Sequence, residues 1–542
     1  MKIYSTLILF LLLFVSCKNK GDDNKWNIFS KQNYTDLLLE ESEINTYFLA
    51  NKESIEVEKE VREFYTNRNL QFAWFNKKGM TQAVPNFYNQ LQNYSTDFND
   101  ATFKNKQLDS IISFVKTNDD DLELNESQKK NLELFLTTTF FKYSEKVYGG
   151  ITKNPHQLDW FIPRNKKNYQ AFLDSTLLKN TGKKVQEPVN IYYTELRKKL
   201  SLYRNIQKKG GFPVIKTSEK LLSVNMIDSS IINAKKRLFL TGDLKKNDRT
   251  NIFNEDLVKA VINFQQRLGL PENGEIDVKT LVELNRTVDF RIMQMMVNLE
   301  RLRWIPEKIE NDYILVNIPE YKLHVFENQK LIWETNVVVG KAANQTSIFK
   351  GNISSIVLNP YWNIPNSIIN NEILPSVKKN RSYLRRNNME VLSGNTVVNS
   401  NSINWNKYEK NVPYTIRQKP GLSNSLGKMK FLFPNSFSIY LHDTPSKGLF
   451  DRNQRNFSHG CIRVENPKKL LYYILRNYKT WTEARANKIL ETNKEYGIPI
   501  KPTVPVYIAY FTAWVDANGE LNFRNDIYDL DKKLENEIFA NN

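Results

Sequence analysis

A cysteine flanked by a histidine and an arginine is the part of this sequence best suited to chemistry. The stretch Ser458-His459-Gly460-Cys461-Ile462-Arg463-Val464 contains one of only two cysteines in the chain. A thiol is a strong nucleophile only as the thiolate, and a nearby imidazolium or guanidinium favours that form. His459 and Arg463 supply both groups locally. The stretch therefore indicates a nucleophilic cysteine.

A second histidine upstream is the expected proton acceptor. The segment from Ser438 to Thr444 alternates like a strand that ends near His442, and a strand end can hold an imidazole rigidly against the next loop. His442 would take the thiol proton and later donate it to the leaving amine. His459 is the alternative base, because it is so close to Cys461 in the chain.

The neighbours of this pair have smaller expected roles. Adjacent side chains in a strand point to opposite faces, so Asp443 is not expected to complete a triad through its carboxylate. Gly460 and the Cys461 N–H are expected to help form an oxyanion hole. Arg463 would favour the thiolate or hold a substrate carboxylate, with a structural ion pair as the alternative. Further supporting or cleft-lining candidates are Ser458, Tyr440 and Trp362.

Two rival chemistries fit the sequence poorly. The four histidines show no His-x-x-x-His or His-x-x-Glu-His spacing, which argues against a zinc hydrolase and against any metal site. Ser458 lacks the Gly-x-Ser-x-Gly elbow of serine hydrolases. A cysteine-dependent acyl transfer without metal or cofactor is the remaining expectation.

The complete motif resembles a known family. Ser-His-Gly-Cys-Ile-Arg-Val, preceded by Tyr-Leu-His-Asp-Thr, is similar to the L,D-transpeptidases that cross-link peptidoglycan. The resemblance implies that Cys461 attacks the diaminopimelate carbonyl of a donor tetrapeptide stem, releases D-Ala and forms a thioester. The side-chain amine of a second stem would resolve it into a 3→3 cross-link. In that family the carbonyl after the histidine, here that of Asp443, orients the base.

The other cysteine suggests export. Ile3 to Ser16 is mostly apolar, follows Lys2, and is too short to span a bilayer comfortably, as in a signal peptide. Phe14-Val15-Ser16-Cys17 resembles a bacterial lipobox, in which the cysteine is lipidated. We expect residues 1–17 to direct the protein to the cell envelope, anchored in the periplasm to the outer membrane. An ordinary secretory signal with an unmodified Cys17 is the alternative.

The elements that must position the site form an α+β multidomain protein. Residues 24–237 show helical stripes, such as Val84, Phe87, Tyr88 and Leu91, and are expected to form a helical scaffold. Residues 238–290 resemble a three-helix peptidoglycan-binding domain, through Phe264-Gln265-Gln266, Gly269-Leu270 and Gly274. A plain helical spacer is the alternative reading of that region.

Residues 291–542 alternate in several segments and are expected to form the β-rich catalytic domain. The resemblance implies a sheet sandwich with the Cys461 loop at one end. Residues 366–426 are polar and Asn-rich, and are expected to be a mobile capping insertion with few buried apolar contacts. The strand Val357 to Pro365, which precedes the insertion, resembles the long-chain subgroup of the family.

Charge and motifs limit the expected partners. The net charge of +18 is spread over scattered Lys and Arg residues, and no nucleic-acid-binding motif accompanies it. Peptidoglycan stem peptides, a membrane through the lipid anchor, and other cell-wall synthesis enzymes are the expected partners. Two alternative functions stay open: an L,D-carboxypeptidase that uses water at the same site, and a non-enzymatic wall-binding lipoprotein. The intact Cys461 and His442 argue against the second alternative.

Overall fold

A computed structural model describes residues 35–117, 124–150, 154–164, 166–177 and 187–539 of the chain. The expected signal segment and Cys17 lie outside these residues. The chain forms two compact units, of which the first takes Met1–Asn89, Asn105–Lys142 and Gln170–Val185 as far as these are described. The second takes Gln90–Lys104, Tyr143–Tyr169 and Gln186–Asn542. No helix in the described ranges combines the length and apolar character needed to cross a bilayer.

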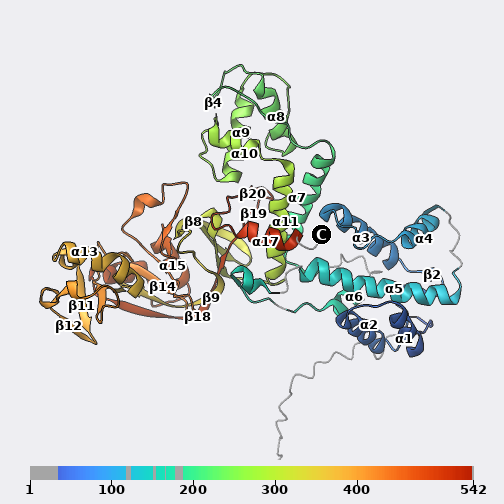
Figure 1. Ribbon diagram of the computed structural model, residues 1–542, viewed down its shortest axis with the longest axis horizontal. Helices are drawn as coiled ribbons and strands as arrows, with labels where there is room; N and C mark the ends of the chain where they lie inside the picture. The colour runs from blue at the N-terminus through green and yellow to red at the C-terminus, as the bar shows by residue number, and fades with distance from the viewer. Residues whose placement is uncertain (1–34, 118–123, 151–153, 165, 178–186, 540–542) are drawn as a thin grey trace, which may run out of the picture. The chain divides into compact units, whose positions relative to one another are not determined.

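The first unit is helical, as expected. It contains α1 (Glu41–Ala50), α2 (Ile55–Asn67), α4 (Lys106–Thr117), most of α6 (Tyr169–Leu177), the first part of α3 (Ala83–Phe98), most of α5 (Glu126–Ser144), and a small hairpin of β1 (Phe75–Asn76) and β2 (Gly79–Met80) (Figure 1). The fully buried Glu133 accepts hydrogen bonds from the N–H groups of Ala73 and Trp74 at 2.5 and 2.9 Å, and from the Tyr65 hydroxyl at 2.8 Å. This carboxyl group satisfies backbone donors that would otherwise be buried without partners.

Three helices in the second unit correspond to the expected wall-binding domain. They are α8 (Ser230–Leu240), α9 (Glu255–Leu268) and α10 (Val278–Leu284), with β4 (Leu221–Leu222) paired to β5 (Ile276–Asp277). Helix α9 ends at Gly269, whose φ of +67° favours glycine. Gln265, only 1% exposed, accepts from the Gly274 N–H at 2.9 Å and donates to the Glu275 carbonyl at 2.8 Å. The motif residues therefore hold the turn between α9 and α10.

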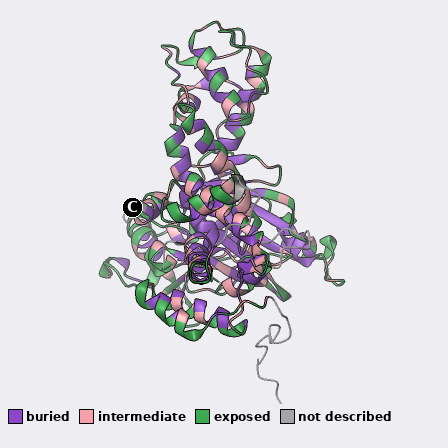
Figure 2. Ribbon diagram, turned by 90° about the vertical axis from the view of Figure 1, so that its right-hand side faces the viewer, coloured by how far each residue is buried: buried purple, intermediate pink, exposed green. Residues whose placement is uncertain are grey.

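The catalytic region is one sheet that closes on itself. Its strands run in the order β14-β15-β17-β8-β7-β6-β18-β9, and β9 also pairs with β14, so the expected sandwich is a closed barrel. The strands contain many buried residues, as do the helices (purple in Figure 2). The strands are β6 (Tyr313–Asn317), β7 (Lys322–Glu327), β8 (Lys330–Gly340), β9 (Ile348–Leu358), β14 (Met429–Leu432), β15 (Leu441–His442), β17 (Ile462–Val464) and β18 (Tyr496–Ala509).

Short elements extend this barrel. The strand β16 (Asn456–Ser458) pairs with β8, and β3 (Trp160–Phe161) pairs with β9. Helices α15 (Pro467–Leu475) and α16 (Glu483–Glu491) follow β17. Strand β15 is shorter than the alternation from Ser438 predicted, because Ser438 has a φ of +57° and interrupts the extended backbone.

The insertion at 366–426 has a core of its own, which corrects the expectation of few buried apolar contacts. It contains α12 (Asn366–Ile368), a π-helical turn η5 (Ile369–Ile373), α13 (Leu374–Lys379), α14 (Tyr383–Arg386), β11 (Met389–Ser393), β12 (Thr396–Val398) and β13 (Thr415–Gln418). With β10 (Trp362–Asn363), its strands form a four-stranded sheet. Eleven buried residues, among them Val377, Leu384 and Ile416, form its core cluster. The many Asn and Ser residues lie around a small apolar centre that composition alone concealed.

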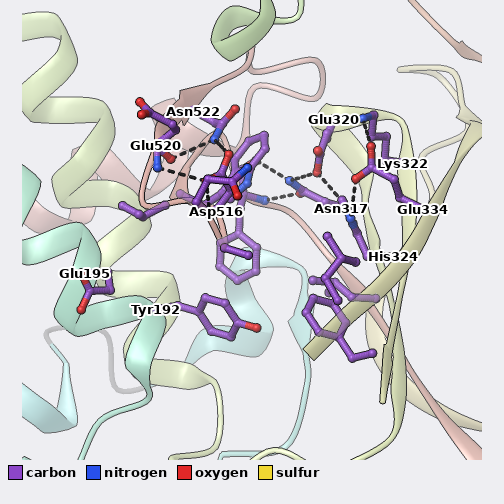
Figure 3. Close-up of a pocket in the computed structure, with 18 of the residues that line it drawn as sticks. Tyr192, Glu195, Asn317, Glu320, Lys322, His324, Glu334, Asp516, Glu520 and Asn522 are labelled. Atoms are coloured by element: carbon purple, nitrogen blue, oxygen red, sulfur yellow. Dashed lines mark hydrogen bonds and ion pairs between the residues drawn. The ribbon is translucent and has the colours of Figure 1, made fainter. Parts of the chain in front are cut away.

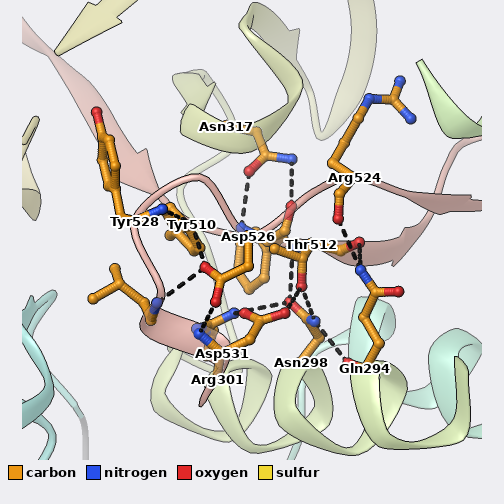
Figure 4. A network of polar contacts seen from close by, with 12 residues as sticks. Gln294, Asn298, Arg301, Asn317, Tyr510, Thr512, Arg524, Asp526, Tyr528 and Asp531 are labelled. Atoms are coloured by element: carbon orange, nitrogen blue, oxygen red, sulfur yellow. Dashed lines mark hydrogen bonds and ion pairs between the residues drawn. The ribbon is translucent and has the colours of Figure 1, made fainter. Parts of the chain in front are cut away.

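The C-terminal segment is fixed by a polar network against α11 (Val288–Trp304), which packs beside α7 (Ile191–Lys208). This segment contains β19 (Ala513–Val515), β20 (Leu521–Phe523) and α17 (Leu530–Phe539). Asn298 and Thr512 exchange two hydrogen bonds of 2.7 and 3.0 Å, and Arg301 pairs with Asp531 at 2.5 Å (Figure 4). Buried polar groups that are satisfied in this way favour a single arrangement.

Candidate active site

The register of three strands places the polar side chains of the site on one face. In β14, β15 and β17, Lys430 lies opposite His442, and His442 lies beside Arg463. Leu441 and Ile462, the alternate residues, are fully buried inside the barrel. Because paired residues share a face and successive residues alternate, the three polar residues lie on the outer face of the barrel. The alternation seen in the sequence therefore positions the site.

Tyr440 joins this face. Its ring centroid lies 5.7 Å from that of His442, and Lys430 Nζ lies 4.0 Å above the Tyr440 ring. The Ile462 N–H donates to the Tyr440 carbonyl at 3.1 Å, which places Cys461 next to Tyr440 at the start of β17. The structure thus brings together five groups: Lys430, Tyr440, His442, Cys461 and Arg463.

His442 is held as a neutral imidazole. Its Nδ1 lies 2.5 Å from the Asp443 carbonyl oxygen. A carbonyl only accepts hydrogen bonds, so Nδ1 carries the proton and Nε2 carries the lone pair. Burial, followed by the positive charge of Arg463, lowers the pKa of His442 to about 3. At neutral pH the ring is therefore an unprotonated base with a fixed tautomer.

The Asp443 carboxylate is turned elsewhere. Its Oδ2 accepts from the Lys428 N–H at 2.8 Å, and its Oδ1 accepts from Lys447 Nζ at 2.8 Å. The side chain makes no contact with the imidazole among the described hydrogen bonds. Asp443 therefore meets His442 through its backbone.

Cys461 is a protonated thiol at neutral pH. Burial raises its pKa above the ordinary value, while hydrogen bonding from Tyr440 and the charges of Lys430 and Arg463 lower it to a smaller extent. The Sγ atom lies 3.6 Å from the Ser438 carbonyl oxygen. In the described part of the chain no hydrogen bond joins this thiol to His442. Catalytic contacts often tighten only when substrate binds, so a thiol with a neutral base nearby suits general-base activation.

The loop before Cys461 is held by its own hydroxyl group. Ser458 Oγ donates to the Cys461 carbonyl at 2.6 Å and accepts from the Gly460 N–H at 3.2 Å. Gly460 has a φ of +115°, a region that L side chains rarely adopt. The Gly460 N–H, expected as an oxyanion donor, is thus already engaged in this state.

His459 is directed to the insertion rather than to the thiol. Its Nε2 lies 2.8 Å from Glu372 Oε1 in η5, and both side chains are more than a third exposed. Trp362 belongs to the sheet of the insertion, where it pairs with Gln418 and packs against the insertion core. The insertion therefore touches the cysteine loop through the contact between Glu372 and His459.

Sequence reasoning missed Lys430 as a site residue. The signal was present, because Lys430 is the one charged residue between Met429 and Phe431, which point into the barrel. Lys430 lies on the outer face of β14, opposite His442 in β15, and so provides positive charge near the Cys461 thiol. Burial lowers the pKa of Lys430, and the negative charge of a Cys461 thiolate acts in the opposite direction when that thiolate forms.

A separate cavity of about 910 Å³ lies on the outer face of β6 and β7. Figure 3 shows its lining side chains, with Tyr192 and Glu195 of α7 facing Asn317, Glu320 and His324. Its charges are largely paired within the wall, since His324 Nε2 lies 2.9 Å from Glu320 and Lys322 pairs with Glu334. None of the five groups Lys430, Tyr440, His442, Cys461 and Arg463 lines this cavity, so it is separate from the candidate site.

Comparison with known protein families decides the nature of the barrel. Residues 311–506 match the L,D-transpeptidase catalytic domain. This chain carries an L,D-transpeptidase catalytic domain. Residues 59–200 match a scaffold domain, and residues 228–284 match a family described as "Putative peptidoglycan binding domain". The α+β organisation expected from the sequence is therefore confirmed, while the domain boundaries and the role of each site residue remain predictions.

A curated protein of Haemophilus influenzae named "Putative L,D-transpeptidase" is 38% identical to this chain over 242 residues. The aligned part covers 44% of this chain and 48% of the relative, so it spans about half of that protein. Two solved L,D-transpeptidases are also similar. The one from Stackebrandtia nassauensis has 13% identity, a TM-score of 0.22, and coverage of 54% of this chain and 97% of that chain. The one from Mycobacterium smegmatis has 11% identity, a TM-score of 0.20, and coverage of 37% and 58%. These scores are low, so the domain assignment rests on the family match and the sequence relative.

Proposed function

We propose that the protein is a peptidoglycan L,D-transpeptidase that forms 3→3 cross-links through a Cys461 thioester. The observation that carries the proposal is the shared face of Cys461 and the neutral His442 within an L,D-transpeptidase domain. Nothing in this reaction requires a metal or an organic cofactor, because nucleophile, base and backbone donors suffice for acyl transfer.

The reaction follows from the protonation states. Sγ of Cys461 attacks the diaminopimelate carbonyl of the donor stem as its proton passes to Nε2 of His442. The resulting imidazolium is stabilised by the Asp443 carbonyl at Nδ1. It then protonates the leaving D-Ala nitrogen as the carbon–nitrogen bond breaks, and a thioester remains. The amine of a second stem attacks that thioester, gives its proton to His442, and the thiol is restored.

Lys430 and Arg463 lie where negative charge develops. Both act electrostatically on Cys461, and their positive charges lower its pKa against the effect of burial. The same charges favour the attacking thiolate and the oxyanion that follows. Arg463 is half-buried with a buried Nε that has no described partner, so its guanidinium remains available to a substrate carboxylate.

The remaining domains suggest where the enzyme acts. A peptidoglycan-binding domain on the same chain supports peptidoglycan as its partner, and both domains support a place in the cell envelope. Lipidation at Cys17, attachment to the outer membrane and acylation by carbapenems belong to the proposal. A chain that holds polymer through one domain raises the effective concentration of stems at the other.

Incubation with purified disaccharide-tetrapeptides tests the proposal against its closest alternative. Formation of 3→3 dimers supports transfer, whereas tripeptides without dimers would show an L,D-carboxypeptidase that uses water as acceptor. Cys461→Ala serves as the control and should give neither product. Absence of both products with the folded wild-type protein would favour a non-enzymatic wall-binding role.

A further inference from the structure

A single backbone donor beside the nucleophile is left without a partner. Gly460 and Cys461 offer two N–H and two carbonyl groups. Ser458 engages the Gly460 N–H and the Cys461 carbonyl, and Thr346 Oγ1 donates to the Gly460 carbonyl at 2.8 Å. Among the hydrogen bonds of the described residues, only the Cys461 N–H of these four groups has no acceptor. This N–H is the donor available to an oxyanion at the attacked carbonyl.

The direction of that N–H is set by the carbonyl of the same peptide unit. The Gly460 carbonyl and the Cys461 N–H belong to one peptide group, and a planar trans peptide points them in opposite directions. Thr346, only 2% exposed, therefore fixes the aim of the N–H by holding the carbonyl. The positive φ of Gly460 makes this peptide orientation accessible without a clash.

A buried tyrosine from the C-terminal segment holds Thr346 in turn. Tyr528 Oη donates to the Gly340 carbonyl at 2.5 Å and accepts from the Thr346 N–H at 3.3 Å. The Gly340 N–H donates to Thr346 Oγ1 at 2.9 Å, which leaves the Thr346 hydroxyl proton for Gly460. A carbonyl oxygen only accepts hydrogen bonds, so the Thr346 hydroxyl is the donor to the Gly460 carbonyl. Tyr528 is itself 3% exposed.

The anchor of Tyr528 lies in the network of Figure 4. The Tyr528 N–H donates to Tyr510 Oη at 3.0 Å, and Tyr510 donates to Asp526 at 2.5 Å. Asp526 also accepts from the N–H groups of Leu530 and Asp531 at the start of α17. Tyr528 lies beyond residues 311–506, the part that matches the catalytic domain. The C-terminal segment thus reaches the nucleophile loop through one hydroxyl group.

We propose that Tyr528 is a positioning residue which, through Thr346 and the Gly460 carbonyl, aims the Cys461 N–H at the oxyanion of the acyl-transfer step. The proposal rests on Cys461 being the nucleophile of the proposed function. It predicts a selective defect. Reactions of Cys461 that build an oxyanion need the aimed N–H, whereas alkylation at a saturated carbon does not.

The test compares acylation with alkylation in Tyr528→Phe. Acylation is followed by intact mass with the donor tetrapeptide and with p-nitrophenyl acetate, and alkylation is followed with iodoacetamide. We expect the acylation rate constant to fall about tenfold with both acyl donors, with KM for the tetrapeptide unchanged, because one aimed oxyanion donor accounts for roughly 10²–10³ in kcat when removed entirely. The alkylation rate should stay within about twofold of the wild-type rate, since alkylation builds no oxyanion.

Matched variants distinguish the positioning of the Cys461 N–H from a general loss of order in the cysteine loop. Tyr478→Phe is the control, because the Tyr478 hydroxyl likewise donates to the Lys501 carbonyl and accepts from the Lys501 N–H, but it does not contact the cysteine loop. Its acylation and alkylation should both be unchanged. Thr346→Val should repeat the selective defect, and Thr346→Ser should restore acylation. The Tyr528→Phe, Thr346→Val double variant should be no worse than Thr346→Val alone.

Two results would overturn the proposal. One is wild-type acylation in both Tyr528→Phe and Thr346→Val. The other is an equal loss of acylation and alkylation, which would indicate a disordered loop rather than a misdirected N–H. If Tyr528→Phe does not fold, the Thr346 pair decides alone. Failure of the wild-type protein to react with the tetrapeptide would count against the proposed function, while p-nitrophenyl acetate would still test the aiming of the N–H.

Discussion

At the scale of single residues, the proton shared by the Cys461–His442 pair lies on the Cys461 sulfur, and His442 is neutral. His442 is neutral because burial and the charge of Arg463 lower its pKa to about 3, and burial keeps the Cys461 thiol protonated. A preformed thiolate–imidazolium pair would require the opposite shifts. The burial that disfavours separated charge also strengthens Lys430 and Arg463 once charge develops on the substrate.

The pH dependence of acylation tests this protonation state. A neutral base with a pKa of about 3 and a thiol with a raised pKa predict a flat kcat/KM between about pH 5 and 8. The rate falls only as acid protonates His442. Stopped-flow acylation with the donor tetrapeptide gives the profile. An inflection between pH 6 and 7, near the ordinary pKa of histidine, would contradict a neutral buried imidazole.

The sequence predicted that His442 lies at a strand end against the Cys461 loop, but it did not define the surroundings of the pair. The alternation in β15 and β17 fixes the face on which the pair lies, because strand pairing is periodic. The partner of His459, Glu372, could not be predicted, since it comes from an insertion of irregular pattern. The hydrogen bond from the Gly460 N–H to Ser458 could not be predicted either, because it depends on the path of a short loop.

At the scale of elements, the insertion is a small folded layer rather than a loose lid. Its polar composition suggested few buried contacts, but alternate residues of short helices and strands supply an apolar core. Glu372 of the insertion contacts His459 of the cysteine loop. A folded layer next to the loop can exclude water from a thioester and so favour an amine acceptor.

Glu372→Gln tests that role of the insertion. Loss of the Glu372–His459 contact should free the π-helical turn from the loop and raise the ratio of hydrolysed tripeptide to dimer by about twofold to fivefold, because a half-exposed polar pair contributes up to about 1 kcal/mol. Muropeptide chromatography measures the ratio. Glu390→Gln is the control, because Glu390 pairs with Arg417 within the insertion sheet. If Glu372→Gln and Glu390→Gln give the same ratio of tripeptide to dimer, the contact between the insertion and the cysteine loop does not influence which product forms.

The barrel wall contains an ion-pair cluster whose contribution to the stability of the folded state depends on pH. His324 in β7 lies 2.9 Å from Glu320 and 3.3 Å from Glu334, and although burial opposes the charge, these carboxylates raise its pKa to about 9. The raised pKa stabilises the folded state fully below about pH 6.5 and the effect is lost as pH rises through about 9. The full shift corresponds to on the order of 3 kcal/mol.

Thermal unfolding of wild-type and His324→Gln protein checks this stabilisation. The variant should melt lower than the wild type at pH 6, and the gap in Tm should narrow as pH rises towards 10. His324 faces Glu334 on the paired strand, and it is only 9% exposed. A gap in Tm that is constant across pH would show that the histidine contributes through packing alone.

At the scale of the whole molecule, one chain joins regions that match an L,D-transpeptidase catalytic domain, a putative peptidoglycan-binding domain and a scaffold domain. Helical periodicity predicted the scaffold, a motif resemblance predicted the peptidoglycan-binding region, and strand alternation with the cysteine motif predicted the β-rich region. The closure of the barrel by β9 and β14 could not be predicted, because that pairing joins strands distant in sequence. The C-terminal network was likewise hidden, since it depends on hydrogen bonds between α11 and residues more than 200 positions away.

Cys17→Ser tests the proposed anchor of the chain. Cys17 ends a short apolar run that is too short to span a bilayer comfortably, so lipidation is the expected attachment. The variant should move from the membrane fraction to the soluble fraction while keeping its activity on soluble tetrapeptides. Membrane association that persists in the variant after a salt wash would show that another feature anchors the protein.

Intact-mass analysis of the acyl-enzyme tests the central claim most directly. Wild-type protein mixed with a disaccharide-tetrapeptide should gain the mass of the donor less D-Ala, and peptide mapping should locate that mass on Cys461. The adduct should disappear when an acceptor stem is added, and 3→3 dimer should form in the same amount. His442→Gln should slow its formation by several powers of ten. A mass gain on any other residue, or dimer formed by folded Cys461→Ala protein, would contradict the account.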